Sequence, residues 1–159
     1  MRTIHLLPLA ILAVLLARPV AAVEMPPEFW VNDKAGWTVE VKPCDTGLCG
    51  YLVDFPSVHA PLPDGPEKDV HNPDRSKRAR PMCGMPLMGG FKPAKPEGKA
   101  WEDGWVYDPV TGSTFSGTIS VIDTHTVKLR GYVGIALFGK TLILRRASDV
   151  PTRCSASAG

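Results

Sequence analysis

Four cysteines are the residues of this sequence with the clearest capacity for covalent chemistry: Cys44, Cys49, Cys83 and Cys154. An even number of cysteines is typical of a disulfide framework in proteins that fold in an oxidising compartment. Cys44 and Cys49 flank a turn-forming tetrapeptide, residues 45–48, and a hairpin there brings their side chains to disulfide distance. By elimination, we expect Cys83 to pair with Cys154.

Two other uses of the cysteines fit the sequence less well. A structural zinc site needs pairs of cysteine or histidine at short spacing with a second pair nearby, and the sequence has no such arrangement. A cysteine nucleophile needs a free thiol, which the even count disfavours. We therefore predict a pair of disulfides, no metal and no cofactor.

Asp69, Asn72 and Asp74 supply oxygen donors that could bind calcium, but the glycine and the distal glutamate of an EF-hand loop are missing. The Asn72-Pro73 pair instead predicts a turn. We expect the histidines after residue 22 to be solvated, since their spacing suits neither metal binding nor catalysis: His59, His71 and His125. No Ser-His-Asp motif and no pair of carboxylates on matching strands is recognisable, so the sequence predicts a protein that is not an enzyme.

Side chains suited to binding a small molecule are easier to find. Trp105 and Tyr107 lie two positions apart and therefore share one face of a strand. Aromatic side chains on one face of a sheet either belong to the core or line a cavity. We expect four aromatic residues to contribute the walls of a ligand cavity: Trp37, Trp105, Tyr107 and Phe115.

Two groups of cations could hold an acidic head group of a ligand. Arg130 lies among strand residues, although it shares a face with Lys128, opposite Leu129, which favours an outward direction. The other group is a cluster in a loop: Arg75, Lys77, Arg78 and Arg80. Acidic residues in the same loop offer an alternative for this cluster, a solvated surface whose charges compensate each other.

The first 22 residues have the pattern of a secretory signal peptide. Arg2 provides the positive start, residues 6–17 are apolar, and small residues precede a cleavage site after Ala22. The apolar stretch is too short to span a membrane, so we expect no stable anchor. Removing the signal leaves equal numbers of basic and acidic side chains, which disfavours nucleic-acid binding and polybasic membrane attachment. We expect one domain, residues 23–159, in the periplasm or outside the cell.

Sixteen prolines and fifteen glycines disfavour long helices. Short apolar or alternating runs between turn signals predict strands. These runs lie at residues 37–42, 48–55, 85–91, 101–107, 113–122, 126–133 and 135–145. Residues 56–80 contain five prolines and predict a long loop that is the most mobile part of the domain. Short strands joined mostly by tight turns predict an all-β fold, either an antiparallel sandwich or an up-and-down barrel.

Several short motifs, read in order, carry a resemblance to a known family: Val39-Glu40-Val41-Lys42-Pro43-Cys44, Leu48-Cys49-Gly50, Asp69 with Asn72-Pro73, Arg80-Pro81-Met82-Cys83-Gly84, Gly90-Phe91, Trp101 with Gly104-Trp105-Val106-Tyr107-Asp108-Pro109 and Gly112, and Leu129-Arg130-Gly131-Tyr132-Val133-Gly134. Over roughly residues 28–146 the chain resembles the bacterial exported family designated domain of unknown function 2147. The resemblance implies a lipocalin-like up-and-down β-barrel, a fold that can enclose a small apolar ligand. The chain departs from the family pattern at Tyr132, where relatives often have cysteine, and at Leu144, where they often have tryptophan.

Together, the residues and the resemblance predict an exported, non-catalytic barrel that binds a small apolar or amphipathic ligand. The alternative is a cell-envelope module for protein-protein interaction with a filled barrel. A large exposed apolar patch would favour this alternative. The sequence predicts neither the identity of the ligand nor the oligomeric state.

Overall fold

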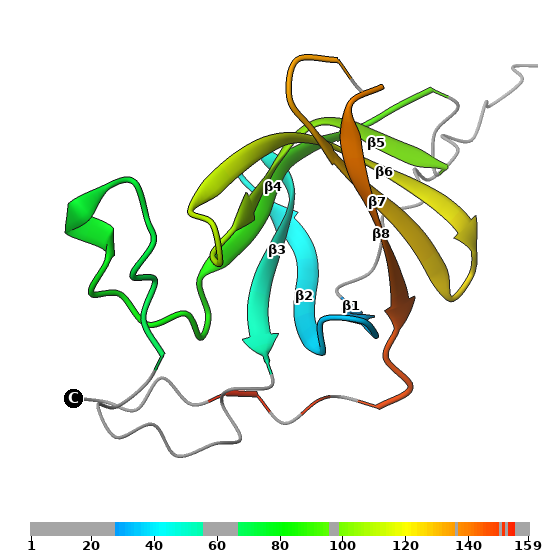
Figure 1. Ribbon diagram of the computed structural model, residues 1–159. Coiled ribbons are helices and arrows are strands. Elements are labelled where there is room, and N and C mark those ends of the chain that lie inside the picture. The colour runs from blue at the N-terminus through cyan, green and yellow to red at the C-terminus, as the bar shows by residue number, and fades with distance from the viewer. Residues whose placement is uncertain are drawn as a thin grey trace, which may run out of the picture.

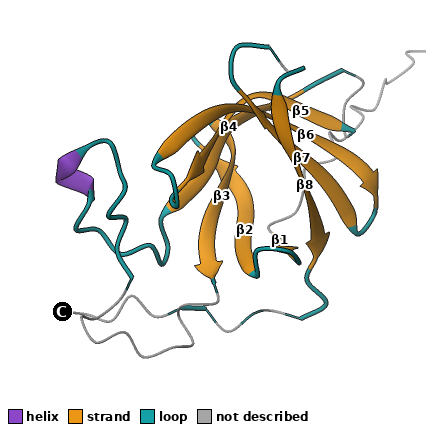
Figure 2. Ribbon diagram, viewed as in Figure 1, coloured by secondary structure: helices purple, strands orange, loops and turns teal. Residues whose placement is uncertain are grey.

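The computed structural model describes residues 28–55, 67–95, 99–135, 137–149, 151 and 153–154. The predicted signal peptide and residues 56–66 of the predicted long loop lie outside the described residues. The described part forms eight strands (Figures 1 and 2): β1 (Glu28–Asn32), β2 (Trp37–Cys44), β3 (Gly47–Asp54), β4 (Pro86–Pro93), β5 (Ala100–Asp108), β6 (Ser113–Asp123), β7 (Thr126–Tyr132) and β8 (Gly139–Arg146).

The eight strands form a closed up-and-down barrel. Each strand pairs antiparallel with the next along the chain, and β8 pairs with β1 to close the sheet. Closure satisfies the backbone groups that an open sheet leaves unpaired at its edges. The predicted all-β barrel is therefore confirmed, and the sandwich alternative is wrong.

Two strands differ from the sequence prediction. No strand is predicted at β1, whose five residues are too few to show a clear alternation. β8 begins at Gly139 rather than at residue 135. The amide of Phe138 donates to the carbonyl oxygen of Ile135 at 3.1 Å. This hydrogen bond closes a turn before the strand starts. The apolar composition of this turn resembles that of a strand, which explains the difference.

Side chains fill the section of the barrel around Phe91, which is fully buried on β4. The ring of Phe91 occupies the space that side chains at Gly104 and Gly117 would need. A Cβ on Gly117 would lie 2.9 Å from Cζ of Phe91 and 2.8 Å from Cγ2 of Val106. The core around this ring includes Trp30, Val39, Val41, Leu52, Met88, Trp101, Ile119, Val127, Leu129 and Leu144.

Both predicted disulfides are present. Cys44 and Cys49 are bonded across the β2–β3 hairpin, with their Cα atoms 5.9 Å apart. Cys83 is bonded to Cys154, with Cα atoms 5.8 Å apart. The second bond attaches the C-terminal segment to the connection between β3 and β4, and the amide of Cys154 donates to the carbonyl oxygen of Val53 at 2.7 Å. The C-terminal segment is therefore fastened along the outside of the barrel.

An ion pair adds a second attachment for the same segment. The guanidinium of Arg153 donates to both carboxylate oxygens of Glu40, at 2.6 and 3.0 Å. Hydrogen bonds from Arg153, opposed by partial burial and assisted by Lys42, lower the pKa of Glu40 from 4.5 to about 2. Because the folded pKa is lowered, the pair stabilises the protein above the unfolded pKa and loses this contribution as the pH falls toward the folded value.

We expect acid to weaken the attachment of Arg153 to Glu40. The pair should contribute about 1–2 kcal/mol at neutral pH, a value reduced by solvent screening at the exposed guanidinium, and most of it should vanish between about pH 4.5 and pH 2. Urea unfolding of the wild type and of Glu40→Gln checks this at about pH 6 and about pH 2.5. The gap in unfolding free energy between the two proteins should shrink at the lower pH. A gap that stays constant contradicts the assignment.

Candidate ligand-binding groove

Between β3 and β4 the chain leaves the barrel wall, and residues 67–85 fold into an excursion beside it (Figure 1). The two arms of the excursion pair with each other, since the amide of Asp69 donates to the carbonyl oxygen of Arg80 at 3.1 Å. Between the arms lies a short 3-10 turn, η2 (Arg75–Lys77), drawn in purple in Figure 2. The described part of the predicted long loop therefore has internal structure.

Asp69 fastens the excursion to the barrel. Its side chain is fully buried and accepts hydrogen bonds from the Tyr107 hydroxyl at 2.6 Å, from Nδ2 of Asn72 at 2.7 Å and from Nε of Arg80 at 3.0 Å. Nη2 of Arg80 also lies 2.8 Å from the carboxylate. Burial, together with the hydrogen bond to Asp69, raises the pKa of Tyr107 to about 12, so its hydroxyl remains a donor at physiological pH. A buried carboxylate with this many donors is a structural hub.

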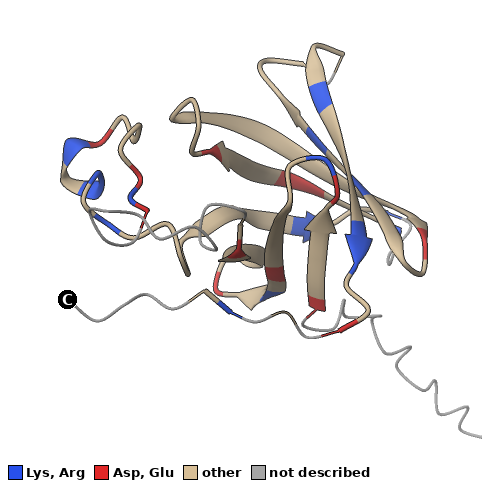
Figure 3. Cartoon of the chain, turned by 60° about the horizontal axis from the view of Figure 1, so that its bottom comes forward, with Lys and Arg blue, Asp and Glu red and all other residues tan. Residues whose placement is uncertain are grey.

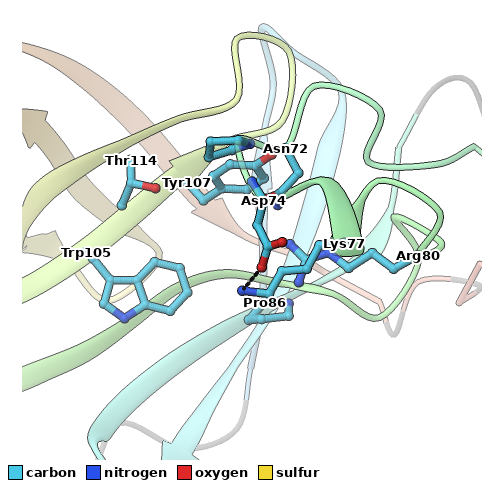
Figure 4. A pocket seen from close by; sticks show the side chains of 9 residues that line it. Asn72, Asp74, Lys77, Arg80, Pro86, Trp105, Tyr107 and Thr114 are labelled. Atoms are coloured by element: carbon cyan, nitrogen blue, oxygen red, sulfur yellow. Dashed lines mark hydrogen bonds and ion pairs between the residues drawn. The ribbon is translucent and has the colours of Figure 1, made fainter.

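An open groove of about 400 Å³ lies between the excursion and the outer wall of the barrel. This volume lies in the range of small-molecule sites, about 300–1,000 Å³. Figure 4 shows Trp105 and Thr114 on one side and Asp74, Lys77 and Pro86 on the other, with Tyr107 between them. The groove is lined by Asn72, Pro73, Asp74, Lys77, Arg80, Pro86, Trp105, Tyr107 and Thr114.

The side of the groove formed by the excursion carries two ion pairs, Lys77 with Asp74 and Arg80 with Asp69. Nζ of Lys77 lies 3.3 Å from Oδ2 of Asp74, and both side chains are about half exposed. Hydrogen bonds from Ser76, followed by the contact with Lys77, lower the pKa of Asp74, which keeps that carboxylate ionised. Exposed pairs of this kind are weak, so Lys77 can exchange Asp74 for another anion.

Trp105 forms the apolar wall of the groove and remains 36% exposed. Its indole lies against Gly89 on β4, where a Cβ would be 3.0 Å from Cζ2 of the ring and 3.0 Å from Sγ of Cys49. The absence of a side chain at Gly89 therefore lets the indole lie close to the barrel wall, beside the Cys44–Cys49 disulfide.

The aromatic residues predicted as one set are divided between the two faces of the sheet. Trp105 and Tyr107 do share a face, but it is the outer face, because they alternate with Val106, which contacts the interior at Gly117. They therefore do not line the barrel interior, and this part of the prediction is corrected. The cause is a bulge between Trp101 and Gly104, which offsets the alternation along β5 and puts Trp101 and Trp105 on opposite faces.

The other predicted ligand residues lie away from the groove. Trp37 packs against the core, and Phe115 faces Gly131 from inside the barrel. Arg130 lies on the outer face of β7, where its guanidinium donates to Oγ1 of Thr141 at 2.9 Å and to the carbonyl oxygen of Leu137 at 3.1 Å. The structure thus brings together only Trp105, Tyr107 and part of the cationic cluster.

Sequence reasoning missed five contributors to the groove: Asn72, Pro73, Asp74, Pro86 and Thr114. Asn72 was assigned to a turn, and its Oδ1 does accept a hydrogen bond from the amide of Asp74 at 2.9 Å. Thr114 pairs with Tyr107 across β5 and β6, which only the register of the strands reveals. Among the described residues, no cluster of His, Cys, Asp and Glu is arranged to hold a metal ion. His71 and His125 are exposed as predicted, while His59 lies outside the described residues.

Residues 29–146 match the family of uncharacterised proteins conserved in bacteria that is designated DUF2147. This chain belongs to that family. No curated protein matches the chain in sequence. Among solved structures, it is similar to protein HP1028 from the human pathogen Helicobacter pylori, which is described as belonging to the lipocalin family. The similarity covers 80% of this chain and 85% of the other, with 19% identity and a TM-score of 0.65.

The family match and the structural similarity confirm the lipocalin-like fold of this DUF2147 chain. At this level of identity the likeness concerns the fold alone. In the part of the chain that the structure describes, no helix is long and apolar enough to cross a membrane.

Proposed function

We propose that this DUF2147 protein binds a small amphipathic anion in the groove between Trp105 and the excursion, without catalysing a reaction. The observation that carries the proposal is the position of a partly exposed indole across an open groove from Lys77 and Arg80. Ligand sites commonly combine apolar walls with a few polar groups that orient the ligand. A lipocalin-like fold is consistent with small-ligand binding.

The groove offers distinct surfaces to the two ends of such a ligand. The apolar part would lie against Trp105 and Pro86, and the acidic group would take the place of Asp74 beside Lys77. Arg80 is held in place by its ion pair with Asp69, so its position at the groove is fixed before a ligand binds.

The outer groove suits this ligand better than the barrel interior around Phe91. The ring of Phe91 occupies that section of the barrel, and its contacts at Gly104 and Gly117 leave no room for an additional molecule there. Trp37 and Phe115, which face the interior, are then packing residues rather than ligand contacts.

We also propose that the protein is exported. The predicted signal peptide, residues 1–22, would direct the single domain formed by residues 23–159 to the periplasm or the exterior. The two disulfides support this compartment, because such bonds persist under oxidising conditions.

A second candidate function, an interaction module of the cell envelope, is favoured by a specific surface. Val133, Ile135, Leu137 and Phe138 lie between β7 and β8 and expose more than half of their surfaces. Exposed apolar groups gathered in one place mark contact sites for other macromolecules or for membranes. This surface lies apart from the groove, so both functions can be tested separately.

We expect dodecanoate, as a probe anion, to quench or shift the tryptophan fluorescence of the folded protein in a saturable way. Trp105→Ala, which lacks the reporter indole, is followed by isothermal titration calorimetry and should lose saturable binding, because it removes the apolar wall. Lys77→Gln should raise the Kd about tenfold, the value of one charge-assisted hydrogen bond. Lys99→Gln is the matched control, since Lys99 is exposed in the β4–β5 connection, outside the groove. Unchanged affinity in both groove variants would refute the proposal.

A further inference from the structure

The connection between β7 and β8 presents apolar side chains to solvent at a projecting tip. Leu137 is 75% exposed, Phe138 70%, Val133 67% and Ile135 59%. These residues follow one another closely in the sequence, and the chain turns at Phe138, so they form one convex surface rather than a groove. Figure 1 shows this connection as the orange loop beyond the ends of β7 and β8. We call it the apolar tip.

All charged side chains of the β7–β8 hairpin behind the apolar tip are basic. From residue 124 to residue 148 the sequence contains five Lys or Arg and no Asp or Glu. Arg145 pairs with Asp33 at 2.6 Å and Arg146 with Glu28 at 2.7 Å, both at the far end of the hairpin. Lys128 and Lys140 lie nearer to the tip than these pairs, and Figure 3 shows blue segments without red along the hairpin at its top.

Arg130 connects the apolar tip to the barrel. Its guanidinium donates to the carbonyl oxygen of Leu137 and to Oγ1 of Thr141, so one cation braces the loop that carries the apolar side chains. This hydrogen bond satisfies the carbonyl oxygen of Leu137, which would otherwise lose its hydrogen bonds to water when the tip is buried. The apolar side chains are therefore presented by a supported turn.

We propose that the apolar tip inserts into the surface of a membrane that contains anionic lipids. A convex group of aliphatic and aromatic side chains can enter the acyl boundary, while Lys128 and Lys140 contact lipid head groups from the same hairpin. A protein partner would need both a concave apolar pocket and acidic groups placed to face Lys128 and Lys140. The chain after residue 22 has a formal net charge of zero. Its basic and acidic residues are segregated along the sequence, so this hairpin can still attract anionic lipids.

Co-sedimentation with vesicles tests the proposal. The folded protein should bind equimolar phosphatidylcholine and phosphatidylglycerol vesicles, bind phosphatidylcholine vesicles much less, and dissociate at high salt. Leu137→Ser combined with Phe138→Ser should lower partitioning at least about tenfold. Val110→Ser is the matched control, because Val110 is equally exposed, at 75%, in the β5–β6 turn. Lys128→Gln combined with Lys140→Gln should weaken binding to the anionic vesicles by about tenfold or more.

The altered side chains are exposed, so circular dichroism and urea unfolding should show that these variants fold normally. As a direct readout, a Phe138→Trp variant should gain blue-shifted fluorescence only with anionic vesicles. Absence of vesicle binding by the wild type, or an equal loss in Val110→Ser, would overturn the proposal. A wild-type dimer that the Leu137 and Phe138 changes convert to monomer, without vesicle binding, would instead identify a second copy as the occupant and also overturn it.

Discussion

Replacing Asp69 by alanine should lower the free energy of unfolding by about 3–5 kcal/mol, among the largest effects expected for a single substitution. Asp69 is fully buried and receives hydrogen bonds from Tyr107, Asn72 and Arg80. Its removal leaves a hydroxyl, an amide and a guanidinium without their acceptor, in a place that water does not freely enter. Urea unfolding at neutral pH measures the effect directly.

Asp74→Ala provides the comparison from the same excursion. Asp74 is also a carboxylate with hydrogen-bonded neighbours, but it is about half exposed. Its removal should change the unfolding transition far less than the removal of Asp69. If the two variants lose similar stability, Asp69 is not the attachment point of the excursion. Amide hydrogen exchange should agree, with residues 67–82 losing protection in Asp69→Ala.

The second large effect is expected from the Cys83–Cys154 disulfide. It closes a loop with a sequence separation of 71, whereas Cys44 and Cys49 are separated by only 5. If disulfides act mainly by restricting the unfolded chain, removal of the long-range bond should cost about 4 kcal/mol and removal of the hairpin bond about 2 kcal/mol. We therefore expect Cys83→Ala/Cys154→Ala to unfold at a clearly lower urea concentration than Cys44→Ala/Cys49→Ala.

The decisive result is which of the two double variants is less stable toward urea. The long-range bond also holds the segment that brings Arg153 to Glu40, so its removal should abolish the acid dependence predicted for that pair. A Cys44→Ala/Cys49→Ala variant less stable than the Cys83→Ala/Cys154→Ala variant would contradict the assigned roles of the two bonds.

The strands of this barrel could be predicted from sequence because most of them alternate clearly. β2 is an example, since its apolar residues Val39 and Val41 face the core at every second position. β1 is too short to show such a pattern, and its place depends on pairing with β8, far away in the sequence. Ile135, Leu137 and Phe138 belong to a strand-like run, but their side chains are exposed and have no partner layer, and a hydrogen bond from the amide of Phe138 to the carbonyl oxygen of Ile135 forms a turn.

The groove could be predicted only in part. Spacing places Trp105 and Tyr107 on one face, but it does not say which face, because the bulge near Asp103 shifts the alternation after Trp101. Asp103 adopts a left-handed φ of 60°, which Asp tolerates better than most residues but which no alternation pattern marks. The role of Asp69 depends on contacts with residues up to 38 positions away, which no local pattern reveals.

The central claim, that a small amphipathic anion binds in the groove, can be tested by NMR of the tryptophan indole groups. The sequence contains four tryptophans, so their indole N–H signals can be assigned individually with single variants. Titration with dodecanoate should shift the Trp105 signal saturably and leave the signals of the buried Trp30 and the interior Trp37 in place. A saturable shift of Trp37 with Trp105 unmoved would put the ligand inside the barrel and contradict the groove.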